Sequence, residues 1–428
     1  MVCNLNHVLL HKIFHLNVSW FLAKRLAFNN QNTFSKLIIK LAVLATSISV
    51  AVMIVALAAF NGFNKVISEK IFSLSGHVRI LNKEAARINN AEETPFTRCD
   101  DTIKAIAKTI PAINYLQPYY SKSGLLQSKQ TIEGILVKGI DNTYNLKALD
   151  KFLIAGRWLQ FNDTTYSKEI CISRTIANKL NAQNNDDLLL YIVQADQERR
   201  TRKVKIVGIF NTGIEEYDSH LIIGDMAMVQ RLCLVDSTQI SGYELFLNNY
   251  ALMDTVAVNI FANETFPYER VDTKTIKDIN PQIFEWLALQ GQTKWLLMAI
   301  MVVVAVLNLI SCLIVLVLER VRMIGILKAI GAKLMQIQWV FVYNALFISG
   351  IGILLGVFLG LMVCYAQQYF GFITLPEESY FVNKAVIAIN YLHVALIAIC
   401  TLIITFFVLL IPSLVVRVIQ PIKAINFK

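Results

Sequence analysis

WLLMAIMVVVAVLNLISCLIVLVL occupies residues 295–318 and contains no charged side chain. At about 1.5 Å per residue, a helix of this length extends about 36 Å, enough to cross the roughly 30 Å hydrocarbon core of a bilayer. A buried helix of a soluble core has a shorter uninterrupted apolar run. The stretch therefore predicts a transmembrane helix.

Three more apolar runs have the length of a membrane span, at residues 37–60, 339–366 and 391–416. Composition agrees, because 55% of the 428 residues are hydrophobic and only 16% are charged, which is too apolar for an ordinary soluble enzyme. The first run ends in Ala56-Leu57-Ala58, which also fits a signal-peptide cleavage site. However, it is too long for a signal h-region and 36 residues precede it. We expect four spans, the first retained.

Basic residues indicate the orientation of these spans. Residues 1–60 carry basic but no acidic side chains, and residues 319–338 and 417–428 are also net basic. Residues 61–294 are balanced and residues 367–390 are slightly acidic. The positive-inside rule then places both termini and the 319–338 segment in the cytoplasm. The basic pI of about 9.1 thus reflects topology, and no nucleic-acid partner is expected.

Between the first and second spans, residues 61–290 predict a large extracytoplasmic α+β domain. We expect strands at 125–128, 132–140, 169–173, 188–193 and 203–210, and helices after Asp100, at 175–180 and at 251–260. The basic run at 199–203 predicts a solvated hairpin tip rather than an anion site. The full division is 1–36 interfacial or cytoplasmic, 37–60 span, 61–290 domain, 295–318 span, 319–338 cytoplasmic, 339–366 span, 367–390 outer loop, 391–416 span and 417–428 tail.

Asn280-Pro281 is a favourable helix start, because Asn suits the N-cap and Pro the first helical position. An unbroken helix from there to Leu318 would extend about 57 Å, well beyond the membrane core. The excess would form a stalk that couples the span to the α+β domain. Gly291 lowers helix stability by about 1 kcal/mol relative to Ala and could mark a bend instead.

The glycines Gly352, Gly356 and Gly360 recur every four residues in the third span and so share one helix face. Small residues let a neighbouring helix approach closely, so this face predicts tight helix packing. We expect the mid-span amides of Asn308 and Asn344 to bond another helix rather than a transported ion, since neither has an ionisable neighbour in its span.

Cysteine and histidine patterns predict neither a disulfide framework nor a metal site. Cys99, Cys171 and Cys233 are an odd, widely spaced set outside the membrane, so no obligatory bridge is expected, although one pair remains open. The spacing of His7, His11 and His15 puts three imidazoles on one face of a predicted interfacial helix. Without a carboxylate nearby, a polar helix face is favoured over metal binding.

The chain contains no phosphate-binding Gly-x-x-x-x-Gly-Lys-Ser/Thr loop, no Gly-x-Ser-x-Gly elbow and no His-Glu-x-x-His motif. The spans also lack the carboxylates expected of an ion-driven carrier. We therefore expect no enzyme activity and no cofactor in this chain, with energy supplied by a partner.

The segment 319–332 is charged at one end and punctuated by glycines, and it joins two spans as a short amphipathic stretch. Such a segment can present itself to a soluble protein at the membrane surface, although a plain basic connector would show the same pattern. The candidate contact residues are Glu319, Arg320, Arg322, Gly325, Lys328, Gly331 and Ala332.

This segment resembles the coupling region of the MacB/FtsX-like ABC permeases, with its Glu-Arg pair followed by Ile-Gly-Ile-Leu-Lys-Ala-Ile-Gly-Ala. Within that superfamily the chain is most similar to lipoprotein-releasing permeases of LolC/LolE type. It departs from them at Lys423, where an acid often precedes Ala424, and at Ala385, where a proline is frequent. Further matching stretches are Ala23-Lys24-Arg25, Asn61-Gly62-Phe63, Gly76-His77-Val78-Arg79-Ile80, residues 304–311, Ile240-Ser241-Gly242-Tyr243-Glu244, Leu375-Pro376 and Tyr380-Phe381-Val382.

The resemblance implies a fold of four transmembrane helices with a MacB-like periplasmic core domain between the first two. It also implies a partner ATPase dimer that binds ATP and Mg²⁺, a second permease copy or paralogue, and a site in the inner membrane of a diderm bacterium. The cargo would be a lipoprotein, passed from membrane lipids to a periplasmic carrier. From placement alone, the expected acyl path is lined by Phe60, Phe63, Leu296 and Ile300.

Two other readings remain open. The same fold could serve an efflux or cell-division system as a mechanotransmitting permease. Alternatively, the chain could be a membrane-anchored receptor or scaffold without a transport partner.

Overall fold

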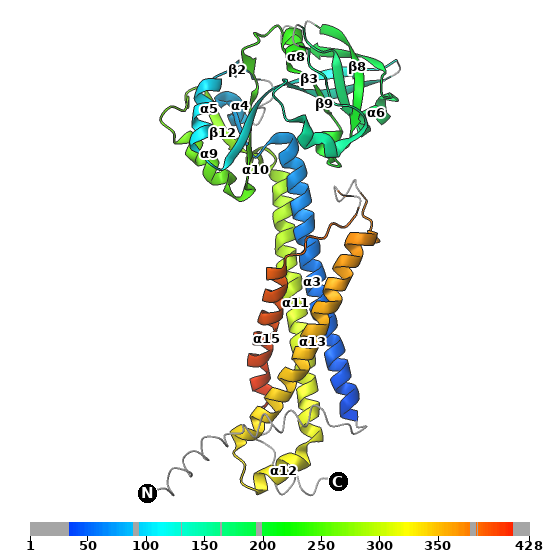
Figure 1. Cartoon of the computed structure of the whole chain (residues 1–428), viewed down its shortest axis with the longest axis vertical. Helices are drawn as coiled ribbons and strands as arrows, with labels where there is room; N and C mark the ends of the chain where they lie inside the picture. The colour runs from blue at the N-terminus through cyan, green and yellow to red at the C-terminus, as the bar shows by residue number, and fades with distance from the viewer. Residues whose placement is uncertain are drawn as a thin grey trace, which may run out of the picture. The chain divides into compact units, whose positions relative to one another are not determined.

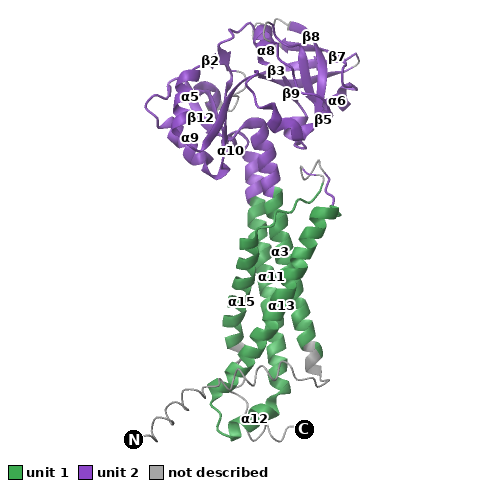
Figure 2. Ribbon diagram, in the orientation of Figure 1, with its two compact units in different colours: residues 1–63, 289–373, 384–428 green, residues 64–288, 374–383 purple. Residues whose placement is uncertain are grey.

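The computed structural model describes residues 34–88, 94–129, 131–162, 165–193, 199–376, 382 and 384–413. The predicted interfacial helix with its three histidines, and Lys423 in the tail, lie outside these residues. The chain divides into two compact units (Figure 2). The helical unit comprises residues 1–63, 289–373 and 384–428, and the α+β unit comprises residues 64–288 and 374–383.

Among the described residues, four helices are long and apolar enough to cross a membrane (Figure 1). They are α3 (Phe34–Ser75), α11 (Pro281–Glu319), α13 (Leu334–Phe370) and α15 (Tyr391–Ser413). A short helix, α12 (Val321–Ala329), lies between α11 and α13. The predicted fold class is confirmed.

Two of these helices extend well beyond the apolar runs that predicted them. Helix α3 continues to Ser75, although its apolar run ends at residue 60. Ile67, Ile71 and Leu74 keep a helical spacing there and are buried, so packing sustains the helix after charged residues have lowered its hydropathy. Helix α11 runs from Pro281 through Gly291 to Glu319, so Gly291 does not interrupt the helix.

Six strands of the α+β unit close into a ring within the described residues. In order they are β3 (Ile113–Gln127), β4 (Ile132–Ile140), β9 (Leu221–Asp225), β6 (Glu169–Ser173), β8 (Arg199–Phe210) and β7 (Asp187–Val193), which pairs with β3 again. The strand β5 (Leu153–Gly156) also pairs with β8. Closure removes most free sheet edges, as in a small barrel.

The other half of the α+β unit is an open antiparallel sheet in the order β12 (Val271–Thr275), β1 (Val78–Asn82), β11 (Gly242–Leu247) and β3. The long strand β3 belongs to both halves, because residues 113–119 pair with β11 and residues 120–127 pair with β4. A small second sheet pairs β2 (Phe96–Thr97) with β10 (Gln239–Ile240).

Short helices complete the α+β unit. The open sheet has α4 (Lys83–Ile88), α5 (Asp100–Thr109), η2 (Tyr250–Leu252), α9 (Met253–Phe261) and α10 (Ile276–Ile279); the barrel has η1 (Leu146–Phe152), α6 (Arg174–Leu180), α7 (Glu215–Asp218) and α8 (Met226–Cys233). Cys99, Cys171 and Cys233 are free thiols.

The basic run at 199–203 corrects one prediction. It is not a solvated hairpin tip, because β8 already begins at Arg199. Arg200 pairs with Ile192 and Arg202 with Leu190 across the β7–β8 ladder. Cross-strand pairing with an apolar strand thus overrides the loop-like composition of the run.

Candidate functional site

The last turn of α3 ends inside the α+β unit, where two cations meet its free carbonyl groups. Lys138 on β4 donates from Nζ to the Leu74 carbonyl oxygen at 2.5 Å, and Arg79 on β1 donates from Nε to the Ser75 carbonyl oxygen at 3.1 Å. Helix C-termini carry a partial negative charge and unpaired carbonyls, so both contacts are favourable. The Leu74 side chain is itself buried among barrel residues such as Phe210 and Ile223.

Glu244 on β11 joins the two cations. Its carboxylate accepts from Lys138 Nζ at 2.7 Å, from Arg79 Nη2 at 2.9 Å and from the Tyr144 hydroxyl at 3.0 Å. The Glu244 side chain is fully buried, and those of Arg79 and Lys138 are only 7% exposed. Burial also raises the pKa of Tyr144 well above its ordinary value, so its hydroxyl stays a donor. Residues of β1, β4 and β11, which come from both halves of the domain, therefore form one hydrogen-bonded group at the C-terminal end of α3.

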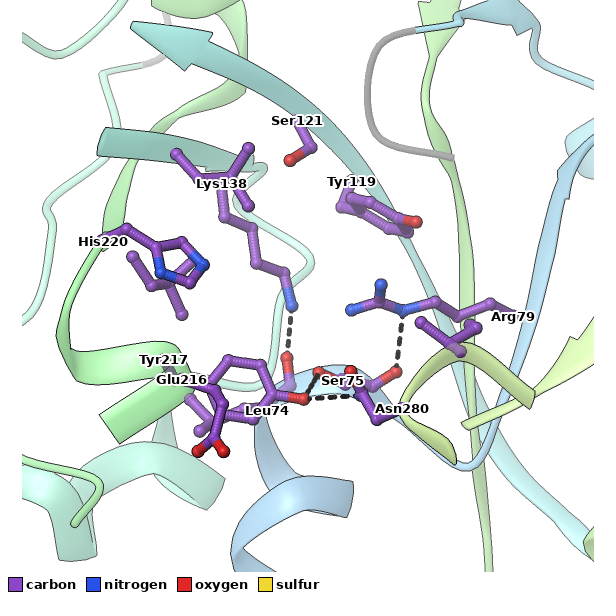
Figure 3. A pocket seen from close by; sticks show the side chains of 13 residues that line it. Leu74, Ser75, Arg79, Tyr119, Ser121, Lys138, Glu216, Tyr217, His220 and Asn280 are labelled. Carbon is purple, nitrogen blue, oxygen red and sulfur yellow. Dashed lines mark hydrogen bonds between the residues drawn. The ribbon is translucent and has the colours of Figure 1, made fainter. Parts of the chain in front are cut away.

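Tyr217 connects the end of α3 with the start of α11. Its hydroxyl lies 3.0 Å from Ser75 Oγ and accepts from Asn280 Nδ2 at 3.1 Å (Figure 3). Burial raises the pKa of Tyr217, which keeps this hydroxyl protonated. Asn280 directly precedes α11. One side chain thus bridges the two long helices where they meet the domain; this group, Arg79, Lys138, Tyr144, Tyr217 and Glu244, is called the helix-end cluster.

A cavity of about 270 Å³ lies beside the helix-end cluster. In Figure 3, Arg79 and Lys138 reach toward it from opposite sides, with Tyr119 and Ser121 between them. The Tyr119 ring lies 5.0 Å from the guanidinium of Arg79 and 5.5 Å from Lys138 Nζ. The arrangement offers hydrogen bonds and cation–π contacts, which suit it to positioning the end of α3.

Sequence reasoning missed the helix-end cluster, although a signal was present. Arg79 and Glu244 are each the one charge of an apolar strand, and Lys138 follows the apolar residues 135–137 in β4. Charged side chains are almost never fully buried unless paired. Opposite charges that are each flanked by apolar residues could therefore have suggested a buried ion pair.

The predicted coupling residues come together around α12. Ile324 and Gly325 are buried, and Ile324 packs in a cluster with residues of α11 and α13. Two other isoleucines of this segment are exposed, Ile326 by 47% and Ile330 by 78%. Of the seven predicted residues, Glu319, Arg322 and Gly331 are exposed, Arg320, Lys328 and Ala332 are half-buried, and Gly325 is buried.

The glycine face of α13 packs against α3. A Cβ atom added to Gly356 would lie 2.7 Å from the Ser47 carbonyl oxygen, and one added to Gly360 would lie 3.2 Å from that of Ala51. At Gly352 the added atom would lie 2.9 Å from Thr46 Cβ. The absence of side chains is therefore what allows α3 and α13 to approach each other.

The two mid-span amides differ. Asn308 on α11 donates to the Ala42 carbonyl oxygen of α3 at 3.1 Å, so it bonds another helix. Asn344 is buried in α13, and its Oδ1 has no hydrogen-bond partner within the described residues.

The four residues predicted to line an acyl path differ in exposure, and their role stays a prediction. Leu296 and Ile300 are 62% and 47% exposed on α11, whereas Phe60 and Phe63 are half-buried on α3. Helix α11 turns other residues, such as Met301, toward the core that it shares with α3.

Two family models together match most of the chain. The model of the MacB-like periplasmic core domain matches residues 41–263, and the model of the FtsX-like permease C-terminal region matches residues 295–421. The chain belongs to the MacB/FtsX-like permease family. The first match takes in most of α3 and of the α+β domain, and the second takes in most of α11 together with α12, α13 and α15. With four apolar helices among its described residues, this permease is a multi-pass membrane protein.

Curated relatives of the permease are lipoprotein-releasing system transmembrane proteins. It is 22% identical to LolC of Xylella fastidiosa (strain Temecula1), with 93% of this chain and 96% of the relative covered. It is 23% identical to LolC of Neisseria meningitidis serogroup B (96% and 99% covered) and 22% identical to LolE of Haemophilus influenzae (96% and 100%).

Solved structures match part of the permease. The periplasmic region of MacB from Actinobacillus actinomycetemcomitans is 11% identical, with 48% of this chain and 91% of that chain covered and a TM-score of 0.33. The extracellular domain of the ABC-type transporter YknZ from Gram-positive bacteria is 16% identical, covering 42% and 88%, with a TM-score of 0.28.

Proposed function

We propose that the permease is the membrane subunit of an ABC transporter that releases lipoproteins from the outer leaflet of the inner membrane to a periplasmic carrier. Relatives named for lipoprotein release cover nearly its full length. The structural observation that carries the proposal is α11, a single helix of 39 residues. One end of α11 follows Asn280 beside the helix-end cluster, and the other reaches Glu319 at the coupling segment.

The proposed energy source is a cytoplasmic ATPase dimer that binds ATP and Mg²⁺ and contacts residues 319–332. Lifting an acyl chain out of a bilayer exposes CH₂ groups that each gain about 0.8 kcal/mol from burial, so extraction needs external work. A continuous helix is a suitable element for carrying that work, because its backbone hydrogen bonds resist bending along its length. The proposed orientation has both termini cytoplasmic, and the proposed assembly contains a second permease copy or paralogue.

Copurification tests the partnership. We expect the permease, purified in mild detergent, to bring down a stoichiometric ATPase. The variant Ile330→Asp places a charge on the most exposed isoleucine of the coupling segment and should lose this ATPase. The control Leu234→Asp changes a residue that is 64% exposed in the α+β domain and should retain it.

Absence of any ATPase with the unaltered permease would favour the receptor or scaffold reading. Undiminished ATPase with Ile330→Asp would reject the coupling segment as the contact. For the cargo, depletion of the permease should leave lipoproteins in the inner membrane; normal lipoprotein sorting would favour an efflux or cell-division system.

A further inference from the structure

The helices of the membrane unit are joined in two different ways, and the difference suggests which of them moves. We propose that α3, α13 and α15 form a fixed group, and that α11 moves against this group when the coupling segment is pushed. The proposal rests on the proposed function, because it assumes an ATPase that acts at residues 319–332.

Backbone contacts hold α3 against α13 over three successive turns. Cβ atoms added at Gly352, Gly356 and Gly360 would all lie within 3.3 Å of carbonyl oxygens of α3. Backbone atoms cannot change rotamer, so sliding of one helix along the other would force these atoms into collision. The α3–α13 pair therefore has a fixed register.

An extended segment, residues 384–390, follows the last turn of α13 and adds a second connection; we call it the strap. Gln367 of α13 donates from Nε2 to the carbonyl oxygens of Ala385 and Ile373, at 3.0 and 3.2 Å. It also accepts from Ile373 N at 2.9 Å, and Gln368 donates to the Ile387 carbonyl oxygen at 3.2 Å. The bonds to Ala385 and Ile387 fasten the strap to α13.

The strap then crosses α3. Ala388 N donates to the Ala58 carbonyl oxygen at 3.0 Å, and a Cβ added to Gly62 would lie only 2.1 Å from the Val386 carbonyl oxygen. At this place only glycine admits the crossing chain. Asn61 Nδ2 lies 3.2 Å from His393 Nδ1 of α15, which brings the third helix into the group.

Helix α11 meets this group through side chains. Leu309, Leu313 and Leu316 pack in an apolar cluster with residues of α3, α13 and α15, and Asn308 adds its bond to Ala42. The glycine of α11, Gly291, has no atom near its missing Cβ. Side-chain layers can shift by changing rotamers, so α11 is held less firmly in register than α13.

The two ends of α12 also differ. Only Arg320 separates α12 from α11, and the Arg320 and Ile324 amides continue the hydrogen bonding across the junction. Toward α13 the chain passes through Gly331, which has a left-handed φ of +92° and no neighbours around its missing Cβ. A displacement of α12 is therefore transmitted directly to α11. The turn at Gly331 can instead change conformation, so less of the displacement reaches α13.

Paired cysteines test this division in the permease purified with its ATPase. One pair, Ala42→Cys with Asn308→Cys, links α11 to the fixed group. The other, Asn61→Cys with His393→Cys, links α3 to α15 inside the fixed group, where Asn61 Nδ2 lies 3.2 Å from His393 Nδ1. Oxidation of the first pair should reduce ATP-driven cargo release by about tenfold or more, within the range of couplings between distant sites. A reductant should restore release, and oxidation of the second pair should leave it unchanged.

Equal effects of the two pairs, or inhibition by the second pair alone, would overturn the proposal. Spin labels give a second measurement that does not depend on forming a disulfide. With labels at exposed Leu44 on α3, Val303 on α11 and Phe358 on α13, ATP should change the 44–303 distance but not the 44–358 distance. Failure to copurify an ATPase would instead refute the proposed function.

Discussion

Lys138 shows how a single residue can connect a long helix to a folded domain. It donates to the end of α3 and to Glu244 at once, while it belongs to the barrel strand β4. Its sequence neighbours predict a strand but give no hint of these partners, since Leu74 and Glu244 are 64 and 106 positions away. Long-range pairing of this kind is set by sheet topology, which a single sequence does not reveal.

Replacing this residue should destabilise the α+β domain. Lys138→Met removes one cation from a buried carboxylate and leaves the Leu74 carbonyl without its donor, a change that costs about 3 kcal/mol. For a domain of this size the thermal midpoint should fall by about 6–12 °C. Circular dichroism of the detergent-purified permease measures the shift.

Lys277→Met is the matched control, because it removes a lysine from an ion pair with Asp254 whose side chains are 42% and 63% exposed. Exposed pairs contribute little, so its midpoint should stay within about 2 °C of the unaltered permease. Equal falls in the thermal midpoint of the two variants would show that the buried helix-end cluster stabilises the domain no more than an exposed ion pair does.

At the scale of elements, hydropathy identifies all four membrane helices, because each contains a long run without charge. It does not find where α3 ends, since Lys65, Glu69 and Lys70 lower the hydropathy while the helical spacing of buried residues continues. The glycine spacing in α13 predicts a close neighbour. That this neighbour is α3 depends on three-dimensional packing and comes from the structure alone.

Gly356→Ala tests the contact between α3 and α13. The added methyl group would lie 2.7 Å from the Ser47 carbonyl oxygen, a backbone atom that cannot move aside. Overpacking of this kind costs about 1–3 kcal/mol, so the thermal midpoint of the membrane unit should fall. Tryptophan fluorescence during heating in detergent follows it.

Gly350→Ala provides the comparison on the same helix, because a Cβ there meets no atom within 4 Å. This variant should match or exceed the stability of the unaltered permease, since Ala is the better helix former. A loss at Gly350 as large as that at Gly356 would contradict the packing account.

At the scale of the whole molecule, α11 is one of two helices, with α3, whose residues belong to both the membrane unit and the α+β domain. The Asn280-Pro281 start predicts this helix correctly, and Gly291 does not interrupt it. The hydrogen bonds at the start of α11 could not be predicted from the sequence. They join Tyr217 to Ser75 and Asn280, which are far apart in sequence.

Gly291→Pro tests whether continuity of α11 matters. Proline removes a backbone hydrogen bond and kinks the helix, at a cost of about 3 kcal/mol. We expect the variant to bind its ATPase and hydrolyse ATP while cargo release is lost. Gly291→Ala, at a site with no neighbouring atoms, should keep both activities; retained release with proline would show that an unbroken helix is not needed.

The helix-end cluster also bears on how the chain is made. Helix α3 leaves the ribosome before the α+β domain, but the carboxylate that balances its two capping cations is Glu244, about 170 residues after Leu74. During synthesis the first span is therefore inserted while its far end still lacks its partners, because domains fold as units once their segments are complete. A nascent chain arrested before residue 244 would expose two uncompensated cations, a state that quality-control proteases could distinguish from the finished permease.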